Sequence, residues 1–476
     1  MPSYKLYYFD ARGAAELARL IMKQAGQDFE DIRLAGEKWL EKKPEMPLKA
    51  MPVLEIDGKK ICQSMAIVRY LAREFGLMGS SNMEALAIEE LLEVFTEITT
   101  KHLMKIYYEQ DQQKKVELMK EFKETGMPPY ITFIESRLKE NNDGKGFYVG
   151  DKVTVADLAL YNTMFSYKHW MGKEGQDPFE GSPLLGEFYQ RVASLPNIAA
   201  WEKARPQTNI PAESGCRQYK LLQVGVGAEG SASDTCILNS PLRGDLEKSR
   251  LGFLEPESLP GNIATMPSYK LYYFEVRGAA ELARLIMKQA GQDFEDIRIN
   301  GLTEWPTKKL EMPLNAVPVL EVDGKKFCQS MAIVRYLARE FDLMGSNNME
   351  ALVIEELLEI FTEITVKHLM KMYYEQDQDK KVEKMKEFKE TGMPPYIKLM
   401  EKRLMENNDG KGFYVGDKVT VADLAIYNTM FNFKKWMGKE GQDPFEGSTL
   451  LNALYERVAL LPNIAAWAKA RPETDM

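Results

Sequence analysis

The chain has 476 residues, of which 45% are hydrophobic and 28% are charged, and its net charge is −9. A sequence of this length and composition predicts about two to four soluble globular domains. The negative charge, without a basic stretch interleaved with aromatic residues, argues against a nucleic-acid partner. No apolar run reaches transmembrane length and no signal-peptide pattern is present, so we expect a cytoplasmic protein without a membrane partner.

The first 79 residues predict a mixed α/β domain. Alternation in Tyr4–Phe9 predicts a strand, followed by a helix over about 14–25, a strand over 29–33 and an irregular piece that carries Trp39. Strands over 53–56 and 60–62 follow, joined by a turn at Asp57-Gly58, and then a helix from Ser64 to about residue 75. We expect Ser64 to cap this helix. The order predicts a mixed sheet covered by helices.

Beyond residue 79 the hydrophobic spacing is helical. It predicts helices over about 83–108, 115–141, 154–171 and 184–195, so residues 80–210 form an all-helical domain. Thr154 and Asp157 have the spacing of an acidic capping box, which favours a structural role for Asp157 over a catalytic one.

Nearly the whole sequence then occurs a second time. Tyr4–Arg19 returns 265 residues later as Tyr269–Arg284, with only two substitutions. One inserted residue, near positions 300–304, changes the offset to 266 for the rest of the copy. A repeat of this length is a duplicated whole protein rather than a solenoid. The second copy therefore repeats the α/β domain over 266–345 and the helical domain over 346–476.

The segment between the copies, 211–265, lacks sustained periodicity. It has two interpretations: a flexible linker with an r.m.s. span of about 40 Å, or the seam of two adjacent genes joined in one reading frame, since the second copy restarts at its own Met266. Absence of every peptide from 211–265 in mass spectra would support the second interpretation.

The four cysteines lack the spacing of metal ligands. Cys62 and Cys328 occupy matching places in the two copies, which argues against a disulfide framework, and Cys216 and Cys236 lie in the intervening segment. We expect reduced thiols and no bound metal.

Tyr8 and Tyr273 end the first strand of each copy, directly before a helix. A helix N-terminus presents N–H groups and the positive end of the helix dipole, which together favour an anion. These tyrosines are therefore candidate site residues. The alternative is that each Tyr-Tyr pair only favours the strand, and Tyr7, on the other strand face, is expected in the core.

The order of these motifs resembles the cytosolic glutathione transferases. The resemblance rests on the tyrosine that ends the first strand, Met51-Pro-Val-Leu-Glu55, Gln63-Ser64 at a helix start, and the helical domain that follows. The run Tyr7-Tyr-Phe, Arg12-Gly-Ala-Ala-Glu16 and then Trp39 and Lys43 is similar to the sigma class, which includes haematopoietic prostaglandin D synthases and S-crystallins. It covers residues 1–210 and 266–476, and it implies a thioredoxin-like domain followed by an all-helical domain in each copy.

The resemblance implies a transferase that adds the glutathione thiolate to small hydrophobic electrophiles, with glutathione as co-substrate and no cofactor. It implies that Tyr8 and Tyr273 stabilise the thiolate by donating their hydroxyl hydrogen to sulfur. A phenol can do this because its own pKa of about 10 keeps it protonated at neutral pH.

The remaining glutathione contacts implied by the resemblance fall into three groups. They are a tryptophan and lysines at the glycyl carboxylate, the residue before a cis-proline at the cysteinyl backbone, and a Gln-Ser pair at the γ-glutamyl carboxylate. These residues are Trp39, Lys43, Lys49, Met51, Pro52, Gln63 and Ser64 in the first copy, and Trp305, Lys309, Val317, Pro318, Gln329 and Ser330 in the second. The lysines could equally be surface residues, and Lys49 is matched by Asn315.

Glu97 and Glu363 take the place of an acidic residue that, in the sigma class, reaches the γ-glutamyl amine of glutathione bound to the neighbouring subunit. The alternative is a solvated helix carboxylate. If the resemblance holds here, each site needs a partner copy, supplied by an intramolecular pseudo-dimer or by a homodimer.

Three departures from the sigma pattern bear on activity. Ala14 and Ala279 replace an arginine that supports the thiolate, and Met104 replaces an aromatic residue, which argues against prostaglandin synthesis. The acidic trio that binds a divalent ion in some relatives is incomplete, at Glu93, Thr96 and Glu97. The missing arginine favours an alternative, an S-crystallin-like structural or ligand-binding protein of low activity, whereas the retained tyrosine and Gln-Ser pair favour the enzyme.

Overall fold

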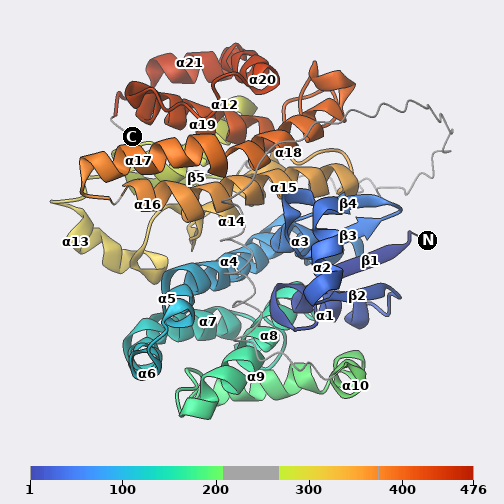
Figure 1. Cartoon of the computed structure of the whole chain (residues 1–476). Coiled ribbons are helices and arrows are strands. Elements are labelled where there is room, and N and C mark those ends of the chain that lie inside the picture. The colour runs from blue at the N-terminus through green and yellow to red at the C-terminus, as the bar shows by residue number, and fades with distance from the viewer. Residues whose placement is uncertain (1, 207–266, 374, 475–476) are drawn as a thin grey trace, which may run out of the picture.

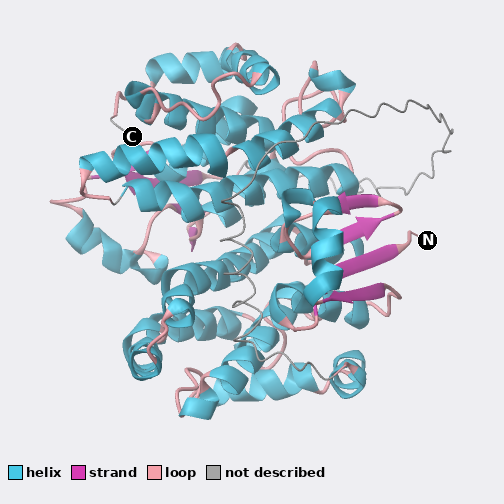
Figure 2. Cartoon of the chain, viewed as in Figure 1, coloured by secondary structure: helices cyan, strands magenta, loops and turns pink. Residues whose placement is uncertain are grey.

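The computed structural model describes residues 2–206, 267–373 and 375–474. Each copy contains a small mixed sheet with helices packed on it, followed by a helical domain, as predicted (Figures 1 and 2). The predicted linker over 211–265 lies outside the described residues. Within the described ranges, no helix is both long and apolar enough to cross a membrane.

The four-stranded sheet of the first copy has the order β2-β1-β3-β4. Strand β1 (Tyr4–Phe9) pairs parallel with β2 (Glu30–Leu34) and antiparallel with β3 (Val53–Ile56), which pairs antiparallel with β4 (Lys59–Ile61). The Asp57-Gly58 turn has positive φ at both residues, 47° and 88°, as the two-residue hairpin requires.

The helices that cover this sheet differ from the prediction at three points. The chain after β1 makes a 3₁₀ turn (Gly13–Ala15) before α1 (Glu16–Gln24). The piece that carries Trp39 is a helix, α2 (Gly36–Lys42), rather than irregular; at seven residues it is too short for the periodicity to show. Helix α3 (Ser64–Glu74) begins at Ser64, but its N-cap is Gln63 at a φ of 72°, and this N-cap makes no side-chain capping bond. The expectation that Ser64 is the cap was therefore wrong.

The helical domain has shorter helices than predicted. The predicted helix 83–108 is α4 (Asn82–Ile98), a π-helical segment (Thr99–Leu103) and α5 (Met104–Tyr108). The predicted helix 115–141 is α6 (Gln112–Glu121), a second π-helical segment (Phe122–Gly126) and α7 (Pro128–Glu140), since the prolines at 128 and 129 fit only a first turn. The remaining helices are α8 (Val155–Trp170), α9 (Pro183–Ala193) and α10 (Pro196–Ala204), the last of which was not predicted.

The second copy repeats these elements. Its sheet has the order β6-β5-β7-β8. The strands are β5 (Tyr269–Phe274), β6 (Glu295–Ile299), β7 (Val319–Val322) and β8 (Lys325–Phe327). The helices are α12 (Glu281–Ala290), α13 (Trp305–Lys308), α14 (Ser330–Glu340), α15 (Asn348–Ile364), α16 (Met370–Tyr373), α17 (Gln378–Glu387), α18 (Pro394–Met405), α19 (Val421–Trp436), α20 (Thr449–Ala459) and α21 (Pro462–Ala470).

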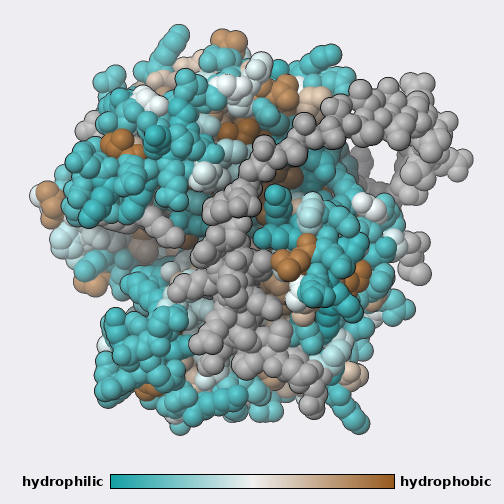
Figure 3. Space-filling model, in the orientation of Figure 1, coloured by the Kyte–Doolittle hydropathy of each residue, from teal (hydrophilic) through white to brown (hydrophobic). Residues whose placement is uncertain are grey.

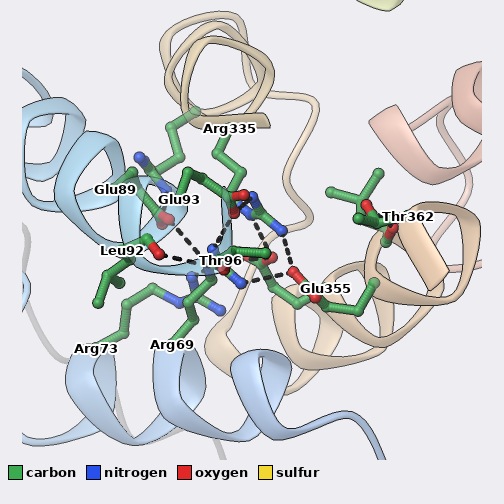
Figure 4. Close-up of polar contacts among 12 residues, drawn as sticks. Arg69, Arg73, Glu89, Leu92, Glu93, Thr96, Arg335, Glu355 and Thr362 are labelled. Atoms are coloured by element: carbon green, nitrogen blue, oxygen red, sulfur yellow. Dashed lines mark hydrogen bonds and ion pairs between the residues drawn. The ribbon is translucent and has the colours of Figure 1, made fainter. Parts of the chain in front are cut away.

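The two copies pack against each other with α4 on α14 and α15 on α3. A network of alternating charges lies at the centre of this contact (Figure 4). Its two central side chains are fully buried, and each binds carboxylates of both copies: Arg69 contacts Glu89, Glu93 and Glu359, and Arg335 contacts Glu355, Glu93 and Glu359. Burial opposes ionisation of Glu355, but the charges of Arg335, Arg69 and Arg73 outweigh it and lower the pKa of Glu355 to about 2. Glu355 is therefore ionised at neutral pH.

The face of the described residues that Figure 3 shows is mainly hydrophilic. In the view of Figure 3, hydrophobic residues are scattered over the described part of the chain rather than gathered in one large patch. This is an ordinary surface for a globular protein.

Candidate active site

Tyr8 lies at the carboxyl end of β1, next to the start of the first helix. Its hydroxyl oxygen accepts a hydrogen bond from the backbone N–H of Ala14 at 3.1 Å, and the Tyr273 hydroxyl accepts one from Ala279 at 3.0 Å. Tyr7 points to the other side, where its hydroxyl donates to Glu55 at 3.0 Å. The strand therefore directs adjacent phenols to opposite sides, one toward Glu55 and one toward the N-terminus of a helix, as the alternation predicts.

Gly13 permits this close approach. Its φ is +42°, and a Cβ added there would lie 2.5 Å from the Tyr8 hydroxyl oxygen and 2.9 Å from Cε1 of the ring. In the second copy, Gly278 has a φ of +39° and the same 2.5 Å approach to Tyr273. Only glycine fits this position while the phenol stays where it is.

Trp39 packs edge-on against Phe9, with ring centroids 5.7 Å apart, and its side chain is buried. Its indole N–H has no hydrogen-bond partner among the described residues. A buried donor of this kind is costly unless it is satisfied, and a ligand carboxylate could accept its hydrogen bond. Trp305 is half-buried against Phe274, at 5.2 Å between ring centroids.

The predicted lysines differ in exposure. Lys43 is half-buried at the end of α2, whereas Lys49 and Lys309 are exposed. Lys49 follows Leu48, and both residues have a positive φ of about 50°. The structure therefore places Lys43 beside Trp39 on one helix end, and Lys49 on a separate turn.

The predicted proline and glutamine lie at the edges of β3 and α3. The peptide bonds Met51-Pro52 and Val317-Pro318 are cis, as the resemblance implied, and Met51 is buried. Gln63 precedes Ser64 and the N-terminus of α3, so their backbone and side chains lie at the positive end of that helix.

The structure joins Gln63 to the other copy. The side chain of Gln63 donates to Glu363 at 2.7 Å, and that of Gln329 donates to Glu97 at 2.6 Å. Glu97 also accepts a hydrogen bond from the Tyr130 hydroxyl at 2.8 Å, so it is held rather than free in solvent. Burial, and then the charge of Glu97, raise the pKa of Tyr130, which keeps this hydroxyl a donor.

Sequence reasoning missed a second acidic residue that crosses between the copies. The backbone N–H of Cys62 donates to Glu356 at 2.8 Å, and that of Cys328 donates to Glu90 at 2.7 Å. Burial, and then the charge of the facing glutamate, raise the pKa of both thiols well above their usual range, so both are protonated. The run Glu89, Glu90, Glu93 and Glu97 along one helix was the sequence signal for a charged helix face at a contact.

The electrostatics near Tyr8 reflect the missing arginine. Position 14 carries only a methyl group, and the guanidinium carbon of Arg19 lies 5.9 Å from the Tyr8 ring centroid. Arg19 is fully buried and already pairs with Asp31 at 3.0 Å and Glu16 at 3.2 Å. Its charge is therefore largely neutralised by these carboxylates.

Among the described residues, no group of three or more histidine, cysteine, aspartate or glutamate side chains could hold a metal ion. Glu93, from the incomplete acidic trio, instead pairs with Arg69 and Arg335.

Family models match both copies of the chain. The model for the N-terminal domain of glutathione S-transferases matches residues 4–73 and 269–339, and the model for the C-terminal domain matches residues 99–205 and 365–471. One copy is 36% identical over 213 residues to glutathione S-transferase 1 of Ascaris suum, covering 44% of this chain and 99% of the relative. The chain belongs to the glutathione S-transferase family.

Two other relatives represent the groups that the resemblance named. The chain is 39% identical over 210 residues to S-crystallin SL11 of Nototodarus sloanii, covering 44% of the chain and 99% of the relative. It is 35% identical over 213 residues to hematopoietic prostaglandin D synthase of Gallus gallus, covering 44% of the chain and all of the relative. Each match spans one copy, so the chain carries two full-length glutathione S-transferase units. The predicted family, fold class and transferase activity are confirmed.

Proposed function

We propose that each copy adds the thiol of glutathione to small hydrophobic electrophiles, with Tyr8 and Tyr273 stabilising the thiolate. The observation that carries this proposal is the place of each hydroxyl at the N-terminus of a helix. The oxygen accepts a backbone N–H, which polarises the O–H bond and favours donation of its hydrogen to a negative sulfur.

The required stabilisation is modest. A free thiol has a pKa of about 8.5, and lowering it by about 2 units takes roughly 2.7 kcal/mol of preference for the thiolate. A charge-assisted hydrogen bond contributes about 1.5–3 kcal/mol. One phenol, assisted by the helix N-terminus, is therefore sufficient without the arginine that Ala14 and Ala279 replace.

The other predicted residues would hold the two ends of the tripeptide. We propose that the unsatisfied indole N–H of Trp39, with Lys43 beside it, binds the glycyl carboxylate of glutathione. Gln63 and Ser64, at the N-terminus of α3, would bind the γ-glutamyl carboxylate. Glu363 already contacts Gln63 across the copies and would accept hydrogen bonds from the γ-glutamyl amine.

This arrangement makes each site a product of both copies, and we propose an intramolecular pseudo-dimer. Sequence differences between the copies support it over two homodimers. The guanidinium carbon of Arg137 lies 5.2 Å from the ring centroid of Phe133 in its own copy and 5.3 Å from that of Phe327 in the other. The matching positions around Arg403 hold aliphatic residues, Ile61 and Leu399. Pairing of unlike copies thus places both aromatic residues around one arginine, where each gains a cation–π contact.

Turnover of the intact chain tests the tyrosines. With 1-chloro-2,4-dinitrobenzene as electrophile, Tyr8→Phe and Tyr273→Phe should each remove the contribution of one site and leave the other. The double variant should lose at least tenfold in turnover, about 1.4 kcal/mol in the activation barrier. Unchanged turnover of the double variant would exclude the tyrosines from the mechanism.

The absent arginine also supports a second candidate, a structural protein of the S-crystallin kind. Under that alternative the wild-type chain turns over barely faster than the double phenylalanine variant. The same assay therefore separates the two functions.

A further inference from the structure

A buried cluster of arginines at the start of the first helix differs between the copies. In the first copy, Nη1 of Arg12 donates to both carboxylate oxygens of Glu202, at 2.9 Å each. Its guanidinium carbon lies 3.8 Å from the ring centroid of Phe165, and Nη2 donates to Asn162 at 3.2 Å. Arg12 is therefore bound from three sides.

The second copy keeps the aromatic and asparagine contacts of this arginine but lacks the carboxylate that matches Glu202. Arg277 lies 3.8 Å from the ring centroid of Phe431 and donates through Nη2 to Asn428 at 2.7 Å, as its counterpart does. Position 468, however, is alanine where the first copy has Glu202. The side chain of Arg277 is buried at 4% exposure, and its Nε and Nη1 have no hydrogen-bond partner among the described residues.

Glu281 is the remaining carboxylate of this cluster, and it cannot replace Glu202 because it lies near three arginines at once. Glu281 pairs with Arg471 at 2.7 Å, and it lies 3.5 Å from both Arg277 and Arg284. Arg284 has its own partner in Asp296 at 3.0 Å. The first copy has two glutamates, Glu16 and Glu202, for the matching arginines. Its Arg19, which matches Arg284, also pairs with Asp31. The second cluster is therefore one negative charge short.

The surroundings of Arg277 reflect this shortage. Burial, with a smaller effect from the charge of Arg471, lowers the pKa of Arg277 to about 10 against the opposing charge of Glu281. The guanidinium carbon of Arg471 lies over the same Phe431 ring, at 4.7 Å from its centroid. Two like charges thus lie against one aromatic ring in a buried place, an arrangement that is costly without a counter-ion.

We propose that the second copy binds a small monovalent anion at Nη1 of Arg277, in the position that the Glu202 carboxylate takes in the first copy. The exchange of glutamate for alanine removes one methylene and one carboxylate, so by size the anion is chloride or an acetate-sized carboxylate. Guanidinium groups bind such anions with directed N–H donors. Tyr427 is buried and matches Tyr161, which forms a side-chain hydrogen bond with Glu202 in the first copy, so its hydroxyl is a further donor for the anion. This site does not depend on the role of Tyr273.

Crystals of the full chain soaked in bromide test the site directly. Bromide replaces chloride and is located by anomalous scattering. We expect a bromide peak within hydrogen-bond distance of Nη1 of Arg277, and none beside Arg12. A water molecule in place of bromide at Arg277, or equal peaks in both copies, would overturn the proposal.

Matched variants extend the test to solution. Ala468→Glu supplies the missing carboxylate and should abolish the bromide peak, whereas Glu202→Ala should create one beside Arg12. With chloride exchanged for bulky gluconate at constant ionic strength, the melting temperature of the wild-type chain should fall by about 2 °C or more, because a ligand that binds only the folded state stabilises it. Ala468→Glu should lose this dependence. An equal fall in both proteins would exclude a specific anion.

Discussion

Adjacent residues have separate roles at the candidate site, and alternation of the strand accounts for this. Tyr7 donates to Glu55 in the core and Tyr8 accepts from the helix N-terminus, as the period of two predicts. The burial of the Trp39 indole N–H without a hydrogen-bond partner among the described residues could not be predicted. Helix α2 has only seven residues, too few for the hydrophobic spacing to show which side chains it buries. The missing carboxylate beside Arg277 could not be predicted either. In the first copy that carboxylate is Glu202, which lies 190 positions from Arg12 in the sequence.

Gly13→Ala should displace the Tyr8 hydroxyl. The added Cβ would lie 2.5 Å from that oxygen, so we expect a loss of at least tenfold in turnover by the first site. The assay uses the Tyr273→Phe background, in which only the first site works. Gly26→Ala is the control, because it has a similarly strained φ of +69° with no atom within 4 Å of the added Cβ. Equal losses in both variants would assign the effect to backbone strain rather than to the phenol.

At the scale of elements, the strands were predicted more closely than the helices. Strand β1 and strand β3 have the predicted bounds, because alternation and the Asp57-Gly58 turn define both ends. The long helices were predicted as continuous because their apolar spacing continues through the π-helical segments and the prolines at 128 and 129. The capping box at Thr154 is confirmed: Asp157 accepts from the backbone N–H and the hydroxyl of Thr154, at 2.7 and 2.8 Å.

Asp157→Asn should destabilise the chain more at low pH than at neutral pH. Burial raises the pKa of Asp157 to about 6, and the unfolded value is about 3.9. The folded state therefore binds more protons between these values, so the stability that this group contributes is full below pH ~4 and is lost as pH rises through ~6. The free energy of unfolding of the variant should fall below that of the wild type at pH 4. We expect this deficit to be larger at pH 4 than at pH 7 by up to about 3 kcal/mol. Urea unfolding across this range measures it, and a pH-independent difference would contradict it.

In the whole molecule, buried charged side chains form a network between the two copies. The central arginines, Arg69 and Arg335, each pair with glutamates of both copies. The resemblance implied that Glu97 and Glu363 reach the opposite copy, with a solvated helix carboxylate as the alternative, and in the structure each accepts a hydrogen bond from the glutamine of the other copy. The network itself was not predicted, because the pairs that join the copies are far apart in the chain, 290 residues for Arg69 and Glu359 and 242 for Arg335 and Glu93.

Exchanging the crossing glutamates should affect the opposite site. In the Tyr273→Phe background, Glu363→Gln should raise the KM for glutathione at the first site about tenfold, because the γ-glutamyl amine loses a charged acceptor. Glu97→Gln in the same background is the matched control and should leave that KM unchanged. If Glu97→Gln instead weakens glutathione binding at the first site, each glutamate serves its own copy and the pseudo-dimer proposal is wrong.

Stabilisation of the glutathione thiolate by one phenol hydroxyl in each copy can be measured by titrating the thiol of glutathione bound to the full chain. Ultraviolet absorbance of the thiolate, followed against pH, should give a pKa about 2 units below the free value of about 8.5 in the wild type. In the variant with both Tyr8→Phe and Tyr273→Phe, the pKa should return most of the way to the free value. A wild-type pKa near 8.5, or a low pKa that survives both substitutions, would show that these phenols do not stabilise the thiolate.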